Sequence, residues 1–216
     1  MLFSLIHPSY GRPQMAYQAY IEWASKAKGE FEYILSLDSR DSTIDRYRQL
    51  FKGQNIIVSD SANCVQATNV AAKAARGKVL IYVSDDFGCP HNWDALLANA
   101  LPQGQSKFCL WVNDTIQNRN AVITIPIISR ALYSELGYFW HPAYESMWVD
   151  VDLYYQIKHM GCLIDCKQLV FPHRHYSVGQ SGYDATYRQH DNRDRQQRGR
   201  QIFNQRSTQQ GWGKRH

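Results

Sequence analysis

The chain contains 216 residues, of which 44% are hydrophobic and 20% are charged, and its formal net charge is +5; this composition is typical of a globular protein with one domain. No apolar run approaches the roughly 18 residues that a membrane-spanning helix needs, and the N-terminus lacks the layout of a signal peptide. We therefore expect a soluble, cytoplasmic protein without a transmembrane segment.

The first half of the chain alternates apolar runs with helical patterns. The expected strands cover residues 2–7, 31–37, 55–58 and 79–83, and the expected helices cover residues 14–28, 46–51 and 63–76. This alternation is typical of an α/β fold, in which crossover helices connect the strands of a parallel sheet. A glycine-rich dinucleotide fingerprint and a P-loop are both absent after the first strand, which argues against a nicotinamide cofactor and a nucleoside-triphosphate motor.

Polar residues follow three of these strands at their carboxyl ends. The apolar run 79–83 leads to the adjacent carboxylates Asp85 and Asp86, Asp38 follows the second strand, and residues 8–12 follow the first. Ligands of open α/β sheets bind outside the carboxyl ends of the strands, and carboxylate oxygens suit hard divalent cations. The sequence therefore predicts a pocket at this edge of the sheet, with a metal ion that binds a diphosphate.

The second half of the chain has a less regular pattern. We expect a helix over residues 92–101, strands over 107–112 and 121–127, helices over 129–136 and 150–160, and a strand end at 170–172. These strands need not be parallel to the first group. The aromatic loop 138–145 has two interpretations, a surface that stacks on sugar or base rings or a packed loop that covers the sheet.

All of the net positive charge lies in the C-terminal segment. Residues 184–216 contain eight of the 24 Lys and Arg and three of the 19 Asp and Glu, so the rest of the chain carries 16 of each sign. We expect one domain over residues 1–183 and a basic, partly flexible arm over 184–216, with residues 207–216 unstructured. Two roles for the arm are open: contact with phosphates or another anionic partner, and a solvated surface.

The five cysteines are an odd number, and no pair has zinc-knuckle spacing with a second pair to match. They are Cys64, Cys89, Cys109, Cys162 and Cys166. We expect free thiols in a reducing compartment.

The order and spacing of the polar positions resemble those of family 2 glycosyltransferases with the GT-A fold. The resemblance runs from residue 3 to about residue 176 and rests on residues 8–12, Asp38, Asn63, Asn69, Gly77, residues 84–86, residues 150–153, His173 and His175. Each motif alone is common, whereas their order together is more specific. The resemblance implies a Rossmann-like, mostly parallel sheet flanked by helices, with a mixed half on the acceptor side.

The resemblance also implies a site for a nucleotide-sugar donor, a UDP- or GDP-sugar. By position, this donor site consists of Pro8, Ser9, Tyr10, Arg12, Asp38, Asn63, Asn69 and Asp85. Ser84 stands where the Asp-x-Asp signature of the family has its first Asp, so the motif is only DXD-like in this chain.

By the same resemblance, Asp86 is the direct ligand of a divalent metal ion, and His173 or His175 is the second ligand. An imidazole beside a carboxylate oxygen favours Mn²⁺ over Mg²⁺. We expect His173 and His175 to point to opposite faces, so that only one histidine reaches the metal. The spacing does not decide which one.

The resemblance further implies that a carboxylate before a Leu-bearing helix removes the proton of the acceptor hydroxyl. Asp150 occupies that position, and Asp152 is the next candidate, with a structural role at the helix start as its alternative. A simpler interpretation makes both of them ordinary acids of a helix N-terminus. A single base opposite the leaving group implies inversion of the anomeric configuration.

The predicted activity is metal-dependent transfer of a hexosyl or related group from a nucleotide-diphosphate sugar to a hydroxyl of a glycan, lipid or protein. Two other classes are open: a nucleotidyltransferase, which usually needs a lysine-bearing, glycine-rich loop that is absent after the first strand, and a non-catalytic protein that binds a nucleotide sugar or nucleic acid. The neutral charge of residues 1–183 argues against nucleic acid, and we expect none as a partner.

Overall fold

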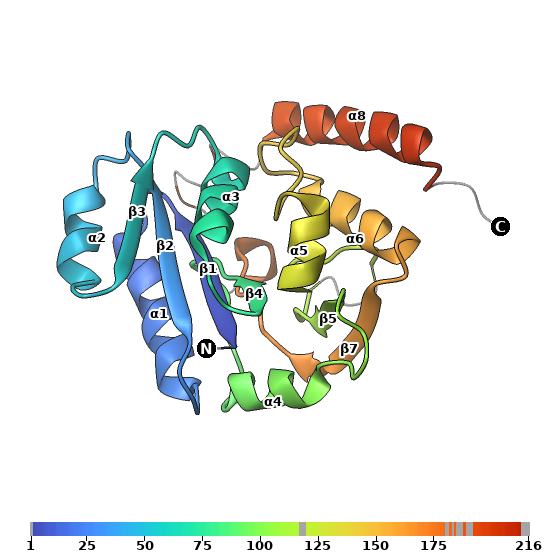
Figure 1. Cartoon of the computed structure of the whole chain (residues 1–216). Helices are drawn as coiled ribbons and strands as arrows, with labels where there is room; N and C mark the ends of the chain where they lie inside the picture. Colours follow the sequence, from blue (N-terminus) through green and yellow to red (C-terminus); the bar gives the residue numbers. More distant parts are fainter. Residues whose placement is uncertain are drawn as a thin grey trace.

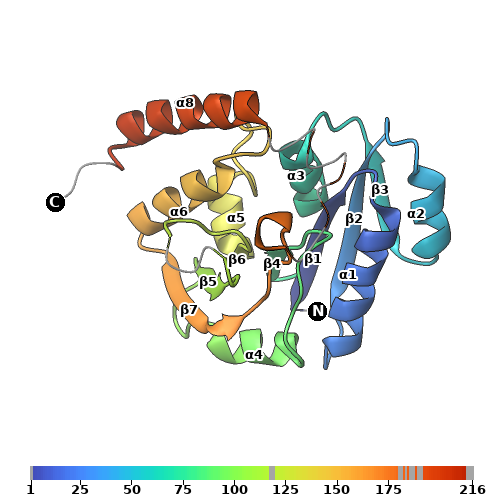
Figure 2. The same cartoon turned by 180° about the vertical axis from the view of Figure 1, so that it is seen from behind.

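A computed structural model of the chain describes residues 2–116, 120–179, 182, 184, 188 and 192–212. The described elements form one seven-stranded sheet with helices on both faces, and the C-terminal helix lies along the outside of the molecule (Figures 1 and 2). Among the helices in these ranges, none is both long enough and apolar enough to cross a membrane. The predicted α/β class is confirmed.

The sheet is parallel in its first half and mixed in its second half. Its strands are β1 (Phe3–Ser9), β2 (Glu32–Asp38), β3 (Asn55–Ser59), β4 (Val79–Tyr82), β5 (Cys109–Asn113), β6 (Ile127–Ser129) and β7 (Leu163–Val170). They follow the order β3-β2-β1-β4-β6-β5-β7, and only β6 runs antiparallel to its neighbours β4 and β5. The carboxyl ends of β1, β2 and β4 therefore meet at one edge, as predicted.

The helices begin and end at local signals in the sequence. They are α1 (Pro13–Lys26), α2 (Ile44–Leu50), α3 (Cys64–Ala74), α4 (Trp93–Ala100), α5 (Arg130–Leu136), α6 (Val149–His159), the short 3₁₀ helix η1 (Tyr176–Val178) and α8 (Arg193–Gln210). The side chain of Asn63 caps α3 by accepting a hydrogen bond from the N–H of Gln66. Gly137, at a φ of 75°, ends α5 in the left-handed conformation.

Each face of the sheet contributes to its own hydrophobic cluster. Leu5 and Ile81 point into the cluster that contains side chains of α1 and α4, whereas Ile6 and Leu80 point into the cluster that contains side chains of α3, α5 and α6. Alternate side chains of a strand face opposite sides, so both faces of β1 and β4 are covered. Residues 79–82 of the apolar run thus form a strand with both faces covered, as predicted, and Val83 follows its end.

The strand predicted at 121–127 is largely wrong. Only Ile127 belongs to β6, although Ile123 and Ile125 are buried. The apolar pattern at 121–127 therefore indicates buried side chains, but most of these residues do not pair in the sheet. Pro126 has no N–H for a ladder, and its carbonyl instead accepts a hydrogen bond from the N–H of Tyr82.

The aromatic loop 138–145 packs over the sheet. Phe139, Trp140 and Tyr144 are buried, and the ring centroid of Trp140 lies 5.4 Å from that of Tyr82 in β4. These rings have no open face on which a sugar could stack. The structure thus favours the second interpretation of the loop.

The C-terminal segment is more ordered than the sequence indicates. Residues 207–210 were expected to be unstructured, but they belong to α8; residues 213–216 lie outside the described residues. Phe203 packs against Trp148 and Tyr155, with ring centroids 5.6 and 5.4 Å apart. Tertiary packing thus stabilises a Gln- and Arg-rich helix. The division of the chain into residues 1–183 and 184–216 stays a prediction.

Gly199 lets α8 approach the loop before α6. A Cβ atom at this position would clash with the carbonyl oxygen of Met147. We expect Gly199→Ala to lower the free energy of unfolding by roughly 1–3 kcal/mol, despite the higher helix propensity of Ala. Thermal unfolding measures this, with the exposed Gln201→Ala as the control on the same helix. A higher Tm for Gly199→Ala would contradict the close approach.

Candidate functional site

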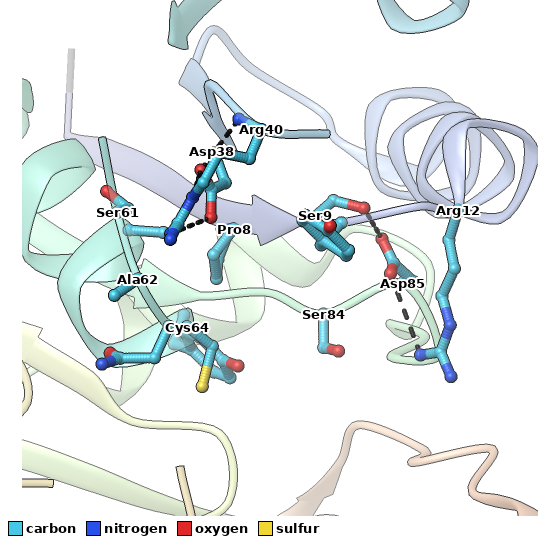
Figure 3. Close-up of a pocket in the computed structure, with 14 residues that line it drawn as sticks. Pro8, Ser9, Arg12, Asp38, Arg40, Ser61, Ala62, Cys64, Ser84 and Asp85 are labelled. Carbon is cyan, nitrogen blue, oxygen red and sulfur yellow. Dashed lines mark hydrogen bonds and ion pairs between the residues drawn. The ribbon is translucent and has the colours of Figure 1, made fainter. Parts of the chain in front are cut away.

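A pocket of about 320 Å³ lies at the carboxyl ends of β1, β2 and β4 (Figure 3). Its wall consists of Pro8, Ser9, Tyr10, Arg12, Asp38, Arg40, Ser61, Ala62, Asn63, Cys64, Ala67, Tyr82, Ser84 and Asp85. Seven of the eight residues predicted for the donor site belong to this wall, with Asn69 as the exception. The volume is within the range of small-ligand sites.

Asn69 stabilises the fold around the aromatic loop. Its side-chain oxygen accepts hydrogen bonds from the N–H groups of Phe139 and Trp140, both at 2.9 Å, and its amide donates to the carbonyl of Trp140 at 2.8 Å. These bonds occupy the side chain away from the pocket. We therefore omit Asn69 from the donor site proposed below.

Asp85 accepts hydrogen bonds at the centre of a buried network. Its Oδ1 accepts from Nε2 of His7 at 2.9 Å and from Oγ of Ser9 at 2.7 Å. The hydroxyls of Tyr33 and Tyr47 lie 2.6 Å from Nδ1 of His7 and 2.7 Å from Oγ of Ser9, respectively. Burial, followed by the charge of Asp85, raises the pKa of Tyr33, so this hydroxyl stays protonated. Hydrogen bonds from His7 and Ser9 of β1 thus fix the position of the Asp85 carboxylate.

Arg12 connects this network to the C-terminal segment. Its Nη1 lies 4.0 Å from Oδ2 of Asp85, and its Nε and Nη2 donate to the two carboxylate oxygens of Asp184 at 2.7 and 2.6 Å. The backbone N–H of Arg12 donates to the hydroxyl of Tyr47 at 2.9 Å. Arg12 is therefore held in the pocket wall by both its backbone and its side chain.

Asp38 and Arg40 form the other end of the pocket (Figure 3). Arg40 donates to both carboxylate oxygens of Asp38, from Nε at 2.9 Å and from Nη2 at 2.6 Å, and its backbone N–H donates at 3.0 Å. These bonds lower the pKa of Asp38 and orient its carboxylate. Arg40 was not among the predicted site residues, although its position two residues after a strand-end carboxylate was a usable signal.

The remaining wall residues that the sequence analysis missed come mainly from the loop before α3 and from its first turns: Ser61, Ala62, Cys64 and Ala67. The thiol of Cys64 donates to the carbonyl of Glu145 at 3.3 Å, and burial raises its pKa to about 11. It is therefore a poor nucleophile at neutral pH. All five cysteines are free thiols, as predicted.

Asp86 lies next to the pocket and contacts His173, which is 87 positions away in the sequence. Its Oδ2 is 3.1 Å from Nε2 of His173. Backbone hydrogen bonds align the two segments: the N–H of Arg174 donates to the carbonyl of Asp86, and the N–H of Gly88 donates to the carbonyl of Pro172, both at 2.8 Å. The fold thus places a carboxylate and an imidazole together beside the strand-end pocket.

The expectation that His173 and His175 point to opposite faces is wrong, because side chains two positions apart would share one face even in a strand. β7 ends at Val170, so neither residue lies in a regular strand, and their ring centroids are 5.0 Å apart. Nδ1 of His175 lies 2.8 Å from Oγ of Ser177. His173 is the histidine that contacts Asp86, and His175 packs beside it.

A salt bridge from α1 supports the His173 segment. Arg174 donates from Nη1 and Nη2 to the two carboxylate oxygens of Glu22 at 2.7 and 2.8 Å. Burial opposes ionisation of Glu22, but its hydrogen bonds with Arg174 and Lys26 outweigh this and lower its pKa to about 2. The paired charges hold the chain on either side of Arg174 against α1.

Asp150 lies in the first turn of α6, within electrostatic range of both parts of the site. Burial is the main cause that raises its pKa, and the charges of Asp114 and His173 also act on it. Burial is the main cause that raises the pKa values of Cys64 and Tyr82, two residues of the pocket wall, and the charge of Asp150 adds to it. Its Oδ1 accepts a hydrogen bond from the N–H of Val151 at 2.9 Å. A carboxylate with a raised pKa beside a pocket is suited to proton transfer.

The contacts of Asp152 indicate a structural role. Its side chain is buried, the hydroxyl of Tyr144 donates to it at 2.7 Å, and Nε of Arg206 in α8 donates to it at 2.6 Å. The carboxylate therefore joins α6, the aromatic loop and α8. This agrees with the structural alternative for Asp152.

No protein-family model and no curated protein matches the sequence. Solved structures do match the fold. S. aureus TarS 1-349 in complex with UDP-GlcNAc matches over 88% of this chain and 64% of its own, with a TM-score of 0.61 and 16% identity. A mannosyltransferase from Pyrobaculum calidifontis, in complex with GDP-Man and Mn²⁺, matches over 79% of this chain and 56% of its own, with a TM-score of 0.59 and 12% identity. The chain has the GT-A fold.

Glucosyl-3-phosphoglycerate synthase from Mycobacterium tuberculosis, in complex with Mn²⁺, UDP and phosphoglyceric acid, is a third match. It covers 82% of this chain and 73% of its own, with a TM-score of 0.59 and 14% identity. The chain spans less than two thirds of the length of TarS 1-349 and of the mannosyltransferase. At these identities the likeness establishes the fold, and function has to be argued from the residues.

In this GT-A fold, Asp86 and His173 are a donor set that suits a divalent cation. Nδ1 of His173 is buried and has no hydrogen-bond partner in the structure, so the protein leaves this ring incompletely satisfied. Over the described ranges, no three His, Cys, Asp or Glu side chains form a group that could hold a metal ion. Mg²⁺-like ions often take only one or two protein ligands and complete their shell with phosphates and water, so a two-residue site fits.

Proposed function

We propose that the chain is a metal-dependent, inverting glycosyltransferase that moves a sugar from a nucleotide-diphosphate sugar to an acceptor hydroxyl. The observation that carries the proposal is the contact of Asp86 with His173 beside the pocket of about 320 Å³ at the strand ends. The carboxylate of Asp150 interacts electrostatically with His173 and with Cys64 and Tyr82 of the pocket wall. The GT-A fold and the nucleotide sugars in the titles of its structural neighbours support this proposal.

The pocket is the proposed site of the nucleotide. Asp38, oriented by Arg40, provides carboxylate oxygens at one end, while Ser9, Arg12 and Asp85 line the other end. Pro8, Tyr10 and Asn63 complete the proposed donor site. A UDP- or a GDP-sugar is the expected class of ligand, because the pocket combines hydrogen-bonding groups with the guanidinium group of Arg12 near the strand ends.

Asp86 and His173 would hold Mn²⁺ or Mg²⁺, with the imidazole favouring Mn²⁺. When bound, the metal supplies Lewis-acid stabilisation of the charge that grows on the leaving diphosphate. The protein contributes the position of the two ligands, because the pairing of residues 86–88 with residues 172–174 brings them together.

Asp150 is the proposed general base. Its carboxylate would accept the proton of the acceptor hydroxyl while that oxygen forms its bond to the anomeric carbon and the bond from this carbon to the diphosphate oxygen breaks. With one base on the face opposite the leaving group, the anomeric configuration is inverted. The acceptor would be a hydroxyl of a glycan, a lipid or a protein.

Release of nucleoside diphosphate from a panel of UDP- and GDP-sugars, with Mn²⁺ and with EDTA, tests this function. We expect release from one donor class with Mn²⁺ and its loss with EDTA, together with loss of donor binding. Binding without release over time would indicate a non-catalytic nucleotide-sugar protein. Donor binding that EDTA leaves unchanged would count against Asp86 as a metal ligand, and retained configuration in proton NMR of the product would refute inversion.

A further inference from the structure

The bidentate ion pair between Arg12 and Asp184 joins the pocket wall to a residue 172 positions away in the sequence. Arg12 Nε and Nη2 present two parallel N–H groups to the two oxygens of the Asp184 carboxylate. This arrangement is the one in which arginine binds a phosphate as well as a carboxylate. The carboxylate of Asp184 therefore occupies a position that suits a phosphate group.

The two partners differ in how firmly the fold holds them. The Arg12 side chain is 8% exposed, and its backbone N–H donates to the buried hydroxyl of Tyr47, whereas the Asp184 side chain is 38% exposed. A half-exposed carboxylate returns to water at a much lower cost than a buried guanidinium does. An incoming anion would therefore exchange with Asp184 while Arg12 stays in place.

The carboxylates around Arg12 oppose the binding of an anionic ligand, so the presence or absence of Asp184 affects its affinity. Oδ2 of Asp85 lies 4.0 Å from Nη1 of Arg12, and Asp86, the next residue in the chain, lies beside the pocket, so two carboxylates are already in or next to this part of the pocket. A third carboxylate on Arg12 repels a diphosphate and occupies the guanidinium edge that would bind it. Removing the charge of Asp184 should thus favour diphosphate binding.

We infer that Arg12 binds the diphosphate of the donor and that Asp184 is an internal competitor for the same guanidinium edge. The inference rests on the proposed function and adds an autoinhibitory contact to it. Asp184 lowers the apparent affinity for the donor, because only the fraction of molecules with the Arg12–Asp184 pair open can bind. The chemical class that displaces Asp184 is a diphosphate ester, with inorganic pyrophosphate as its simplest form.

Calorimetric titration with inorganic pyrophosphate, UDP and GDP tests the inference on wild type, Asp184→Asn, Arg12→Gln and the double variant. We expect Asp184→Asn to tighten binding of pyrophosphate and of the preferred nucleotide at least roughly fivefold. In the Arg12→Gln background the same substitution should have no effect, because the shared guanidinium is gone. Asp194→Asn is the matched control, since Asp194 is an exposed carboxylate of the same C-terminal segment. It should leave binding unchanged.

Weaker binding by Asp184→Asn would overturn the inference, since Asp184 would then position Arg12 for the ligand. Equal tightening by Asp184→Asn and Asp194→Asn would also overturn it, because the effect would be one of net charge. Failure of the proposed function would look different. If Asp184→Asn tightened pyrophosphate binding but no nucleotide sugar were cleaved, the competition between Asp184 and the diphosphate would stand and the transferase function would be rejected. Thermal unfolding of each variant establishes that it is folded before titration.

Discussion

Asp86→Asn is expected to lower the Mn²⁺-dependent release of nucleoside diphosphate by roughly 100-fold or more. The substitution preserves the size of the side chain and an oxygen that can face His173, 3.1 Å away, but it removes the negative charge that is proposed to bind the divalent cation. The loss should therefore appear in metal affinity as well as in turnover. Calorimetric titration of Mn²⁺ in the presence of UDP measures the first quantity, and diphosphate release measures the second.

Asp85→Asn is the matched control for Asp86→Asn. Oδ1 of Asp85 is engaged by His7 and Ser9, so its expected role is to orient the pocket wall, and its substitution should reduce Mn²⁺ affinity much less. Because it sits in a buried network, the Tm of this variant has to be measured alongside. Equal loss of Mn²⁺ affinity in the two variants, both folded, would show that the two carboxylates act together on the metal.

The parallel half of the sheet could be predicted from the sequence because its signals are local. A buried strand such as 79–83 is a continuous apolar run, and Asn63 and Gly137 mark helix ends by their own hydrogen bonding and conformation. The same local reasoning fails for 121–127, where Ile123 and Ile125 are buried without a strand partner. It also fails for α8, whose packing depends on Trp148 and Tyr155 of another segment.

The candidate site shows the same difference between features with a local sequence signal and features that depend on distant segments. Ser9, Asp38 and Asp85 could be placed together because strand ends of a parallel sheet meet at one edge. The direction of a side chain within its element carries no such signal. Asn69 matches the resemblance by position, yet its amide binds the backbone of the aromatic loop. The contact of Arg12 with Asp184 depends on where the chain returns after 172 residues, which no local pattern encodes.

Asp150→Asn is expected to lower turnover by about 10²- to 10⁴-fold while donor affinity changes little. Asparagine has a similar shape and can still accept the hydrogen bond from the N–H of Val151, but it cannot take up the proton of an acceptor hydroxyl. Steady-state transfer to an acceptor measures turnover, and titration with UDP and Mn²⁺ measures binding. A variant with nearly full turnover would contradict the assignment of Asp150 as the base.

The raised pKa of Asp150 fixes the sign of two further results. Only the ionised carboxylate acts as a base, so activity should fall as the pH decreases through a pKa above the ordinary value for Asp, and Asp150→Asn should lack this dependence.

A carboxyl whose pKa is raised by folding contributes stability below its unfolded pKa, and this stability is lost as the pH rises through the folded pKa. Asp150→Asn should therefore keep or increase the Tm at pH 7. Asp152→Asn instead removes the counter-charge of the half-buried Arg206 from a buried position and should cost on the order of 3 kcal/mol of stability. The two variants thus separate the proposed catalytic carboxylate from a structural one two residues away.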